Sequence, residues 1–338
     1  MKTLAFLGVA HIHTPAFVNR VNDRGEEFKA KAVWDSQTAR AKIAADELGC
    51  AAVDDYRDIL NDAAVDAVII CSETSLHREL VEATAAAGKD VFVEKPLGMG
   101  ASDAYAMQRA IEAADVTFQT GHFMRSMPVY RQLKAWIEAG TLGAITRIRH
   151  SNVHQGAIAA IFDSGRGPYL DWLWMTDPAL SGCGGFGDLG AHSLDILMWL
   201  MGDVESVTAQ VDRLLGKYDC DEYGEGMLRF ANGAIGTIAA GWVDVLQPQS
   251  ILVSGVEGVA HVADGDLYVQ SANLPGTDGG AWNDLPAALP HAFDLFLDAI
   301  SGGDAPLISV KEAADRSAVM DAFYQAAATN SWVQPKSS

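Results

Sequence analysis

Two short motifs, about 90 residues apart, carry side chains that exchange protons or stabilise charge. Lys95 follows Glu94 and precedes Pro96, directly after an apolar run. Asp188 and His192 are four residues apart, so on a helix they lie on one face. A histidine beside a carboxylate suits a general base, and a lysine can stabilise an alkoxide. The residue types indicate proton abstraction from a hydroxyl group, although each motif alone also fits a purely structural lysine or ion pair.

The turn after the first apolar run is a candidate for dinucleotide binding. The fingerprint of such turns is G-x-G-x-x-G, whereas Gly8 here is followed by Ala10 and His13 at the other two positions. The context favours the assignment, because a strand pattern precedes the turn and a helix pattern follows it. Asp35, at the end of the second strand pattern, is placed to bind the ribose hydroxyls of NAD and to repel the 2′-phosphate of NADP. A helix-capping role is the alternative for Asp35.

His11 and His13, two residues apart in this turn, could bring two imidazoles together. The chain offers no cluster of Cys, Asp or Glu near them. A solvent-facing position in the turn, or a contact with the phosphate or nicotinamide, is therefore favoured over metal binding, and we predict no metal site.

The elements around these motifs predict an α/β protein with two domains. In residues 1–122, strand and helix patterns alternate, which is typical of a doubly wound parallel sheet of the Rossmann type. Residues 123–338 predict an α+β domain with a large, mostly antiparallel open sheet. A glycine-rich stretch, 181–190, leads into an expected helix over 188–201 that carries the Asp188 and His192 pair at its open end.

Composition excludes several classes of function. The chain has 338 residues, with 24 Lys+Arg against 44 Asp+Glu, so its formal net charge is −20. This charge disfavours nucleic acids and anionic membranes and suits an uncharged substrate. No apolar stretch reaches the roughly 20 residues that span a bilayer, and the start predicts a strand rather than a secretory signal. The 4 cysteines form no CxxC, which favours a cytoplasmic location.

The segments AGKDVFVEKPLG at 87–98 and GGFGDLGAHSLDILMWLMG at 184–202 resemble the Gfo/Idh/MocA family of oxidoreductases, which includes glucose–fructose oxidoreductase and inositol dehydrogenase. The resemblance implies that Lys95, Asp188 and His192 form the catalytic set. It also implies NAD(P) on the first domain and homodimers or homotetramers built through the open sheet. The sequence departs from the family pattern in the glycine turn, and in the loop 71–77, which lacks the usual proline but retains His77.

Two further sets of site residues follow. The predicted cofactor-binding residues are Gly8, Ala10, His11, Ile12, His13, Asp35, Ser36, Arg40, Cys71, Ser72, Glu73, Thr74, His77, Glu94, Lys95 and His122. The predicted substrate-binding residues are Lys95, Arg125, His154, Arg166, Tyr169, Trp174, Asp177, Asp188 and His192.

We therefore expect an NAD-dependent oxidoreductase that acts on a secondary alcohol or ketone of a sugar, glycoside or polyol. One alternative is an NAD-using glycosidase that oxidises its substrate transiently and shows no net redox change. Another is a non-catalytic sensor of a sugar or of NAD.

Overall fold

The computed structural model describes residues 1–163, 171–277 and 279–337. By proximity of Cα atoms the chain divides into two compact units: Met1–Gly121, Ile161–Gly182 and Pro290–Ser317 form the first, and His122–Ala160, Cys183–Leu289 and Ala318–Ser338 form the second. Two later segments thus belong to the first unit, whereas we expected a single boundary at residue 122. The division into domains stays a prediction.

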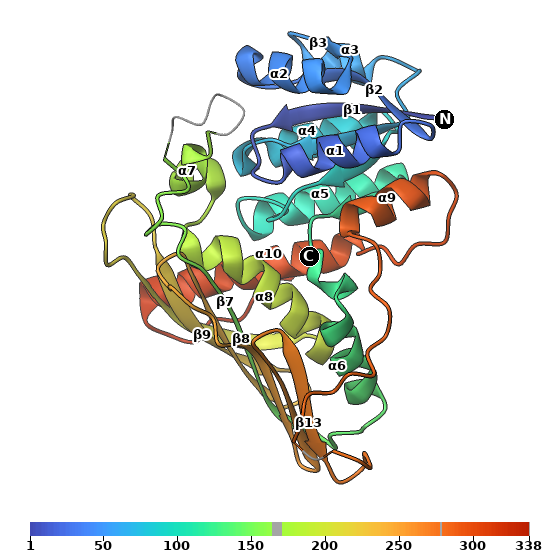
Figure 1. Ribbon diagram of the computed structural model, residues 1–338. Coiled ribbons are helices and arrows are strands. Elements are labelled where there is room, and N and C mark those ends of the chain that lie inside the picture. The colour runs from blue at the N-terminus through green and yellow to red at the C-terminus, as the bar shows by residue number, and fades with distance from the viewer. Residues whose placement is uncertain (164–170, 278, 338) are drawn as a thin grey trace. The chain divides into compact units, whose positions relative to one another are not determined.

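The first unit is built on a six-stranded sheet in the order β3-β2-β1-β4-β5-β6 (Figure 1). All its neighbouring strands run parallel. The strands are β1 (Lys2–Val9), β2 (Phe28–Trp34), β3 (Ala51–Ala52), β4 (Ala67–Cys71), β5 (Asp90–Val93) and β6 (Phe118–Thr120). The order reverses between β1 and β4, where ligands bind in such sheets. This confirms the predicted doubly wound sheet.

Helices in this unit come from three parts of the chain. They are α1 (Thr14–Asp23), α2 (Thr38–Leu48), α3 (Tyr56–Leu60), α4 (Thr74–Ala86), α5 (Ala101–Ala114), η3 (Leu173–Thr176), α7 (Pro178–Ser181) and α9 (Ala292–Ile300). The central strand β4 reads AVIIC and is buried throughout, as expected of a parallel strand covered on both faces.

An aromatic cluster places α9 in the first unit. Phe293 stacks on Phe17 of α1 with ring centroids 4.5 Å apart and meets Phe92 of β5 edge-on at 5.0 Å. All three rings are almost completely buried. Burial of such side chains stabilises a fold by a few kcal/mol each, which explains why a helix near residue 300 packs with the N-terminal sheet.

The second unit contains a seven-stranded sheet in the order β13-β12-β11-β7-β10-β9-β8. Its pairs are antiparallel except β7 with β10. The strands are β7 (Ile145–Val153), β8 (Val204–Asp212), β9 (Tyr223–Phe230), β10 (Ile235–Gly241), β11 (Gln249–Gly255), β12 (Gly258–Ala263) and β13 (Asp266–Ser271). The predicted mostly antiparallel sheet is confirmed.

One face of this sheet is covered by helix α8 (Gly185–Met201), which contacts β7, β9 and β10 (Figure 1). Burial alternates along β9, with Leu228 and Phe230 inside and Met227 and Arg229 exposed, so the other face is open. The unit also contains η1 (Met124–Ser126) and α6 (Pro128–Glu138), while α10 (Val310–Thr329) passes from the first unit into the second. No helix among the described residues has both the length and the apolar character needed to cross a bilayer.

His150 on β7 is a buried imidazole that we expect to make the second unit sensitive to acid. Its ring is buried between Ser193 Oγ, 2.8 Å from Nδ1, and Tyr130 Oη, 3.0 Å from Nε2. Burial lowers the pKa of His150 from 6.5 to about 3. Between pH 6.5 and about pH 3 the imidazole of His150 is protonated in the unfolded chain but stays neutral in the folded chain. The contribution of His150 to stability is therefore fully present above pH 6.5 and is lost as the pH falls toward 3.

We expect the melting temperature to fall steeply below about pH 6.5, because one such group changes the free energy of unfolding by several kcal/mol (on the order of 4). The variant His150→Gln should melt lower at neutral pH but lose less between pH 6.5 and 4. The matched control is His261→Gln, at a partly exposed position, and should keep the wild-type slope. Thermal melts across pH check this, and an unchanged slope in His150→Gln would contradict it.

Candidate functional site

The glycine turn lies between β1 and α1 and is held on both sides. Gly8 has a φ of +84°, and a Cβ at this position would collide with Ser72. The N–H of His11 donates to the carbonyl of Cys71 at 2.9 Å. Trp174 Nε1 donates to the carbonyl of Ala10 at 3.0 Å. The turn is therefore fixed even though only the first glycine of the fingerprint is present.

Glu94, at the end of β5, lies against the two turn histidines. Its Oε1 is 3.1 Å from His13 Nδ1, and its Oε2 is 3.8 Å from His11 Nε2. The backbone N–H of Lys95 donates to Oε2 at 2.9 Å. Burial alone would raise the pKa of Glu94, but electrostatic interactions with His11 and His13, the hydrogen bond with His13 and the nearby Lys95 together outweigh burial and hold this pKa well below its usual range. No acidic residue lies near His11 and His13 along the chain, and the sequence therefore did not predict that Glu94 lies against them.

A buried network joins the ends of β2 and β4. Asp35 Oδ2 accepts the N–H of Val9 at 2.8 Å, and Oδ1 accepts the N–H of Gln37 at 2.7 Å and Arg40 Nε at 2.8 Å. Arg40 also pairs with Glu73. Burial raises the pKa of Asp35 more than the Arg40 guanidinium lowers it. Two carboxylates against one guanidinium leave this corner net acidic.

His77, predicted to contact the cofactor, lies fully buried behind the Lys95 loop. Its Nδ1 is 3.1 Å from the carbonyl of Pro96, and its Nε2 is 3.3 Å from that of Ser72. Burial lowers the pKa of this imidazole. His77 thus joins the loop after β4 to the loop that follows β5. A contact with the cofactor stays a prediction.

In the second unit, Asp188 and His192 lie in helix α8. Trp242, which is fully buried, donates its Nε1–H to Asp188 Oδ2 at 3.0 Å. The ring of His192 meets those of His122 and Phe123 edge-on, at centroid distances of 6.0 and 5.2 Å. The Asp188 carboxylate is therefore oriented by an indole, and His192 is buried among aromatic rings.

Helix α8 begins at Gly185, three residues earlier than predicted. Asp221 from the β8–β9 loop accepts the N–H groups of Gly184 (3.1 Å) and Phe186 (2.8 Å). It also accepts the hydroxyl of Tyr324 at 3.0 Å. This distant carboxylate caps the helix and stabilises its start. His192 consequently lies about two turns inside the helix, and the expectation that it stands at the open end was wrong.

Other residues predicted to bind substrate form hydrogen bonds within their own units. Arg125 donates to both oxygens of Asp195, at 2.6 and 2.9 Å. His154 Nδ1 accepts the N–H of Gly156 at 2.9 Å, and the exposed Asp177 caps α7 through Ala179. Trp174 is buried, with its Nε1 committed to the glycine turn. Arg166 and Tyr169 lie outside the described residues.

The predicted sets are thus distributed over both units. The cofactor-binding residues at positions 8 to 95 all belong to the first unit, and His122 belongs to the second. Lys95 belongs to the first unit, and Asp188 and His192 belong to the second. The sequence reasoning missed Trp242, Asp221 and Tyr324, which no motif marks.

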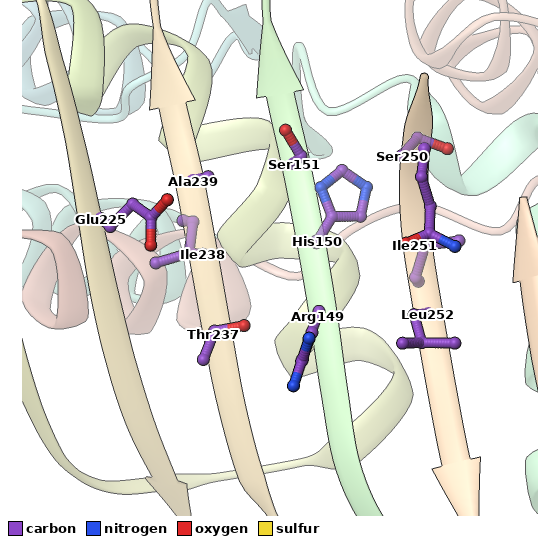
Figure 2. Close-up of a pocket in the computed structure, with 11 residues that line it drawn as sticks. Arg149, His150, Ser151, Glu225, Thr237, Ile238, Ala239, Ser250, Ile251 and Leu252 are labelled. Carbon is purple, nitrogen blue, oxygen red and sulfur yellow. The ribbon is translucent and has the colours of Figure 1, made fainter. Parts of the chain in front are cut away.

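A separate hollow of about 330 Å³ lies on the sheet of the second unit. Figure 2 shows its lining on four neighbouring strands, with Glu225 on β9, Thr237 on β10, Arg149 on β7 and Leu252 on β11. None of the predicted catalytic residues lines it. The hollow is therefore a feature of the sheet surface and does not mark the predicted site.

Family models match both parts of the chain. A model described as "Oxidoreductase family, NAD-binding Rossmann fold" matches residues 2–122, and one described as "GFO/IDH/MocA C-terminal domain" matches residues 130–261. Together they cover about three quarters of the sequence. The chain belongs to the Gfo/Idh/MocA family of oxidoreductases, as the sequence resemblance indicated.

Several curated relatives are sugar or polyol dehydrogenases by name. The chain is 33% identical to myo-inositol 2-dehydrogenase of Thermotoga maritima over 61% of this chain and 59% of that protein. It is 26% identical to levoglucosan dehydrogenase of Pseudarthrobacter phenanthrenivorans over 55% of this chain and 52% of that protein. The matches thus span little more than half the length of these two relatives. A longer match is scyllo-inositol 2-dehydrogenase (NAD(+)) of Bacillus subtilis, 27% identical over 90% of this chain and 86% of the relative.

Solved structures agree with the fold. Levoglucosan dehydrogenase in complex with NADH superimposes with a TM-score of 0.83 at 22% identity, covering 100% of both chains. At this identity the likeness establishes the fold alone.

Proposed function

We propose that this chain is an NAD-dependent dehydrogenase acting on a secondary alcohol, or the corresponding ketone, of a sugar, glycoside or polyol. The observation that carries the proposal is the Asp188 and His192 pair in α8, with the Asp188 carboxylate oriented by the Trp242 indole. The relatives named for inositols and levoglucosan support the substrate class.

Each catalytic residue has a distinct role in the proposed reaction. His192 takes the proton of the substrate hydroxyl as a general base. The Lys95 ammonium stabilises the developing alkoxide. Asp188 orients His192 or binds a neighbouring hydroxyl. When bound, NAD supplies the nicotinamide carbon that accepts or returns the hydride.

The first unit fits a dinucleotide at the glycine turn. The positive φ of Gly8 and its close approach to Ser72 allow no side chain at that position. The first turn of α1 carries no acidic residue, so its N–H groups are suited to a pyrophosphate. Ala10 and His13 carry side chains where the fingerprint has glycines, so the pyrophosphate has less room to approach the backbone at these two positions.

We further propose that NAD is preferred over NADP. Asp35 and Glu73 both engage Arg40, so the one guanidinium at this corner is held by two carboxylates. A 2′-phosphate would meet net negative charge there and an arginine that is already paired. One carboxylate oxygen, Glu73 Oε2, has no hydrogen-bond partner among the described residues and can accept a ribose hydroxyl.

Assembly and location complete the proposal. On β9 and β10, Met227 and Ile235 are 41% and 44% exposed. Apolar side chains on an uncovered sheet favour association, and we propose a homodimer or homotetramer through this face. The cytoplasmic location stays a prediction.

A panel of sugars, polyols and glycosides, incubated with NAD or NADP, tests the proposed function. We expect NADH to form with at least one neutral polyol or sugar. Release of an aglycone without net NADH would contradict the proposal in favour of an NAD-using glycosidase. Sugar binding without either product would contradict it in favour of a sensor.

A further inference from the structure

The imidazoles of His11 and His13 and the carboxylate of Glu94 form a group to which the proposed reaction assigns no step, beyond the predicted contacts with the cofactor. Their ligand atoms, one from each residue, lie within 4.8 Å of one another. The turn brings in the two histidines, and β5 brings in the carboxylate from 81 residues further along the chain. All three belong to the first unit. From this arrangement we propose a binding site for one divalent transition-metal ion of the zinc class.

The donor set is that of an open zinc site. Catalytic zinc sites commonly have three protein ligands, such as two histidines and one glutamate, and keep a fourth position for water. In a tetrahedral site with bonds near 2.0–2.1 Å, neighbouring ligand atoms are about 3.3 Å apart. His13 Nδ1 and Glu94 Oε1 are 3.1 Å apart, and His11 Nε2 and Glu94 Oε2 are 3.8 Å apart. These two distances run to different oxygens of Glu94, and with one ligand atom from each residue the atoms lie within 4.8 Å of one another. Side-chain movements of about 1.5 Å therefore bring the set to the spacing of a tetrahedral site.

The surroundings hold these ligands in place. Glu94 is completely buried and accepts the N–H of Lys95, which fixes one of its oxygens. The ring of Phe17 lies edge-on to His13 at 6.2 Å, and that of Trp174 lies 6.2 Å from His11. Hydrogen bonds such as that from Lys95 orient metal ligands and raise affinity, whereas the two rings limit the space in which the imidazoles can move.

Charge and access also suit a cation. An ionised Glu94 with two neutral imidazoles supplies one negative charge to an ion, and the Lys95 ammonium also interacts with this carboxylate. The side chain of His13 is 32% exposed, whereas those of His11 and Glu94 are buried, so an ion reaches the group past His13.

Occupancy changes the hydrogen bonds of the turn. His11 Nδ1 accepts the N–H of His13 at 3.3 Å, which leaves the proton of a neutral ring on Nε2. A metal ion on Nε2 requires this proton to move to Nδ1. Nδ1 can then no longer accept the N–H of His13, so this hydrogen bond is lost. The His13–Glu94 hydrogen bond is replaced as well. Metal binding is accordingly expected to displace protons and to weaken at low pH.

Titration of the full chain with Co²⁺ alone, after chelation and without affinity-tag histidines, tests the site. We expect one equivalent to bind with visible absorption bands, and Zn²⁺ to displace it. His13→Asn and Glu94→Gln should each weaken binding on the order of 100-fold or more. The matched control His261→Asn, at a partly exposed position, should bind like wild type. Absence of binding, or binding that both variants retain, would overturn the site.

X-ray absorption of the zinc-loaded wild type does not depend on whether the variants fold. A shell of nitrogen and oxygen with two imidazoles supports the assignment, whereas sulfur in the shell or a single imidazole rejects it. Neither measurement requires turnover, so failure of this site and failure of the proposed dehydrogenase are distinguishable.

Discussion

Replacement of His192 by alanine is expected to lower kcat by about 100-fold or more and to leave the dissociation constant of NAD nearly unchanged. General-base catalysis typically contributes about 10²–10⁴ in rate. His192 belongs to the second unit, whereas the glycine turn and Asp35 belong to the first. The loss should therefore appear in the chemical step and not in cofactor binding. Steady-state kinetics and fluorescence titration with NADH measure the two quantities.

Two further variants serve as controls for this prediction. His192→Asn keeps much of the side-chain volume at a position that is only 5% exposed, so it separates loss of the base from loss of packing. His261→Ala, at a partly exposed position, should retain wild-type kcat. Turnover that stays near wild type in both His192 variants would remove His192 from the catalytic set.

Replacement of Asp35 by alanine is expected to weaken NAD by roughly 10- to 100-fold and to improve NADP relative to NAD. Hydrogen bonds to a charged group contribute about 1.5–3 kcal/mol, which corresponds to this range. The change also takes away one of the two carboxylates that engage Arg40, so the guanidinium becomes available to a 2′-phosphate. Binding of each cofactor, measured without substrate, checks both expectations.

The alanine variant has a structural cost that needs its own control. Asp35 also accepts the N–H groups of Val9 and Gln37, so its loss leaves two backbone donors unsatisfied. Asp35→Asn removes the charge and keeps an acceptor in place. Glu27→Gln, at an exposed carboxylate of the same unit, should not alter cofactor preference. A ratio of NADP to NAD affinity that stays at the wild-type value in both Asp35 variants would exclude Asp35 from ribose recognition.

The sequence predicted both sheets, because their patterns are local. Strand β4 is continuously apolar, as a parallel strand covered on both faces must be, and β9 alternates because one face of its sheet is open. The sequence did not predict the membership of α9 in the first unit. Its rings Phe293 and Phe296 pack against a strand some 200 residues earlier in the chain, and no local pattern records such a partner.

In the candidate site, too, the sequence predicted the residues that a local pattern marks and did not predict those that only the fold brings together. Asp188 and His192 were visible because their spacing fits one helical face. Trp242 and Asp221 were not, because a lone tryptophan and one acid in an acidic loop acquire their roles only when β10 and the β8–β9 loop meet α8. For the same reason Glu94 was predicted as a cofactor contact, while its position against His11 and His13 was not.

Isotope transfer from substrate to cofactor tests the central claim most directly. The wild-type chain and NAD are incubated with a sugar or polyol from the panel that carries deuterium on the carbon bearing the reacting hydroxyl. The mass of the recovered NADH is then measured by mass spectrometry. Direct hydride transfer predicts NADH that carries one deuterium, and His192→Ala should form it about 100-fold more slowly or worse. Recovery of unlabelled NADH, or product formation with no reduced cofactor, would contradict the proposed dehydrogenase.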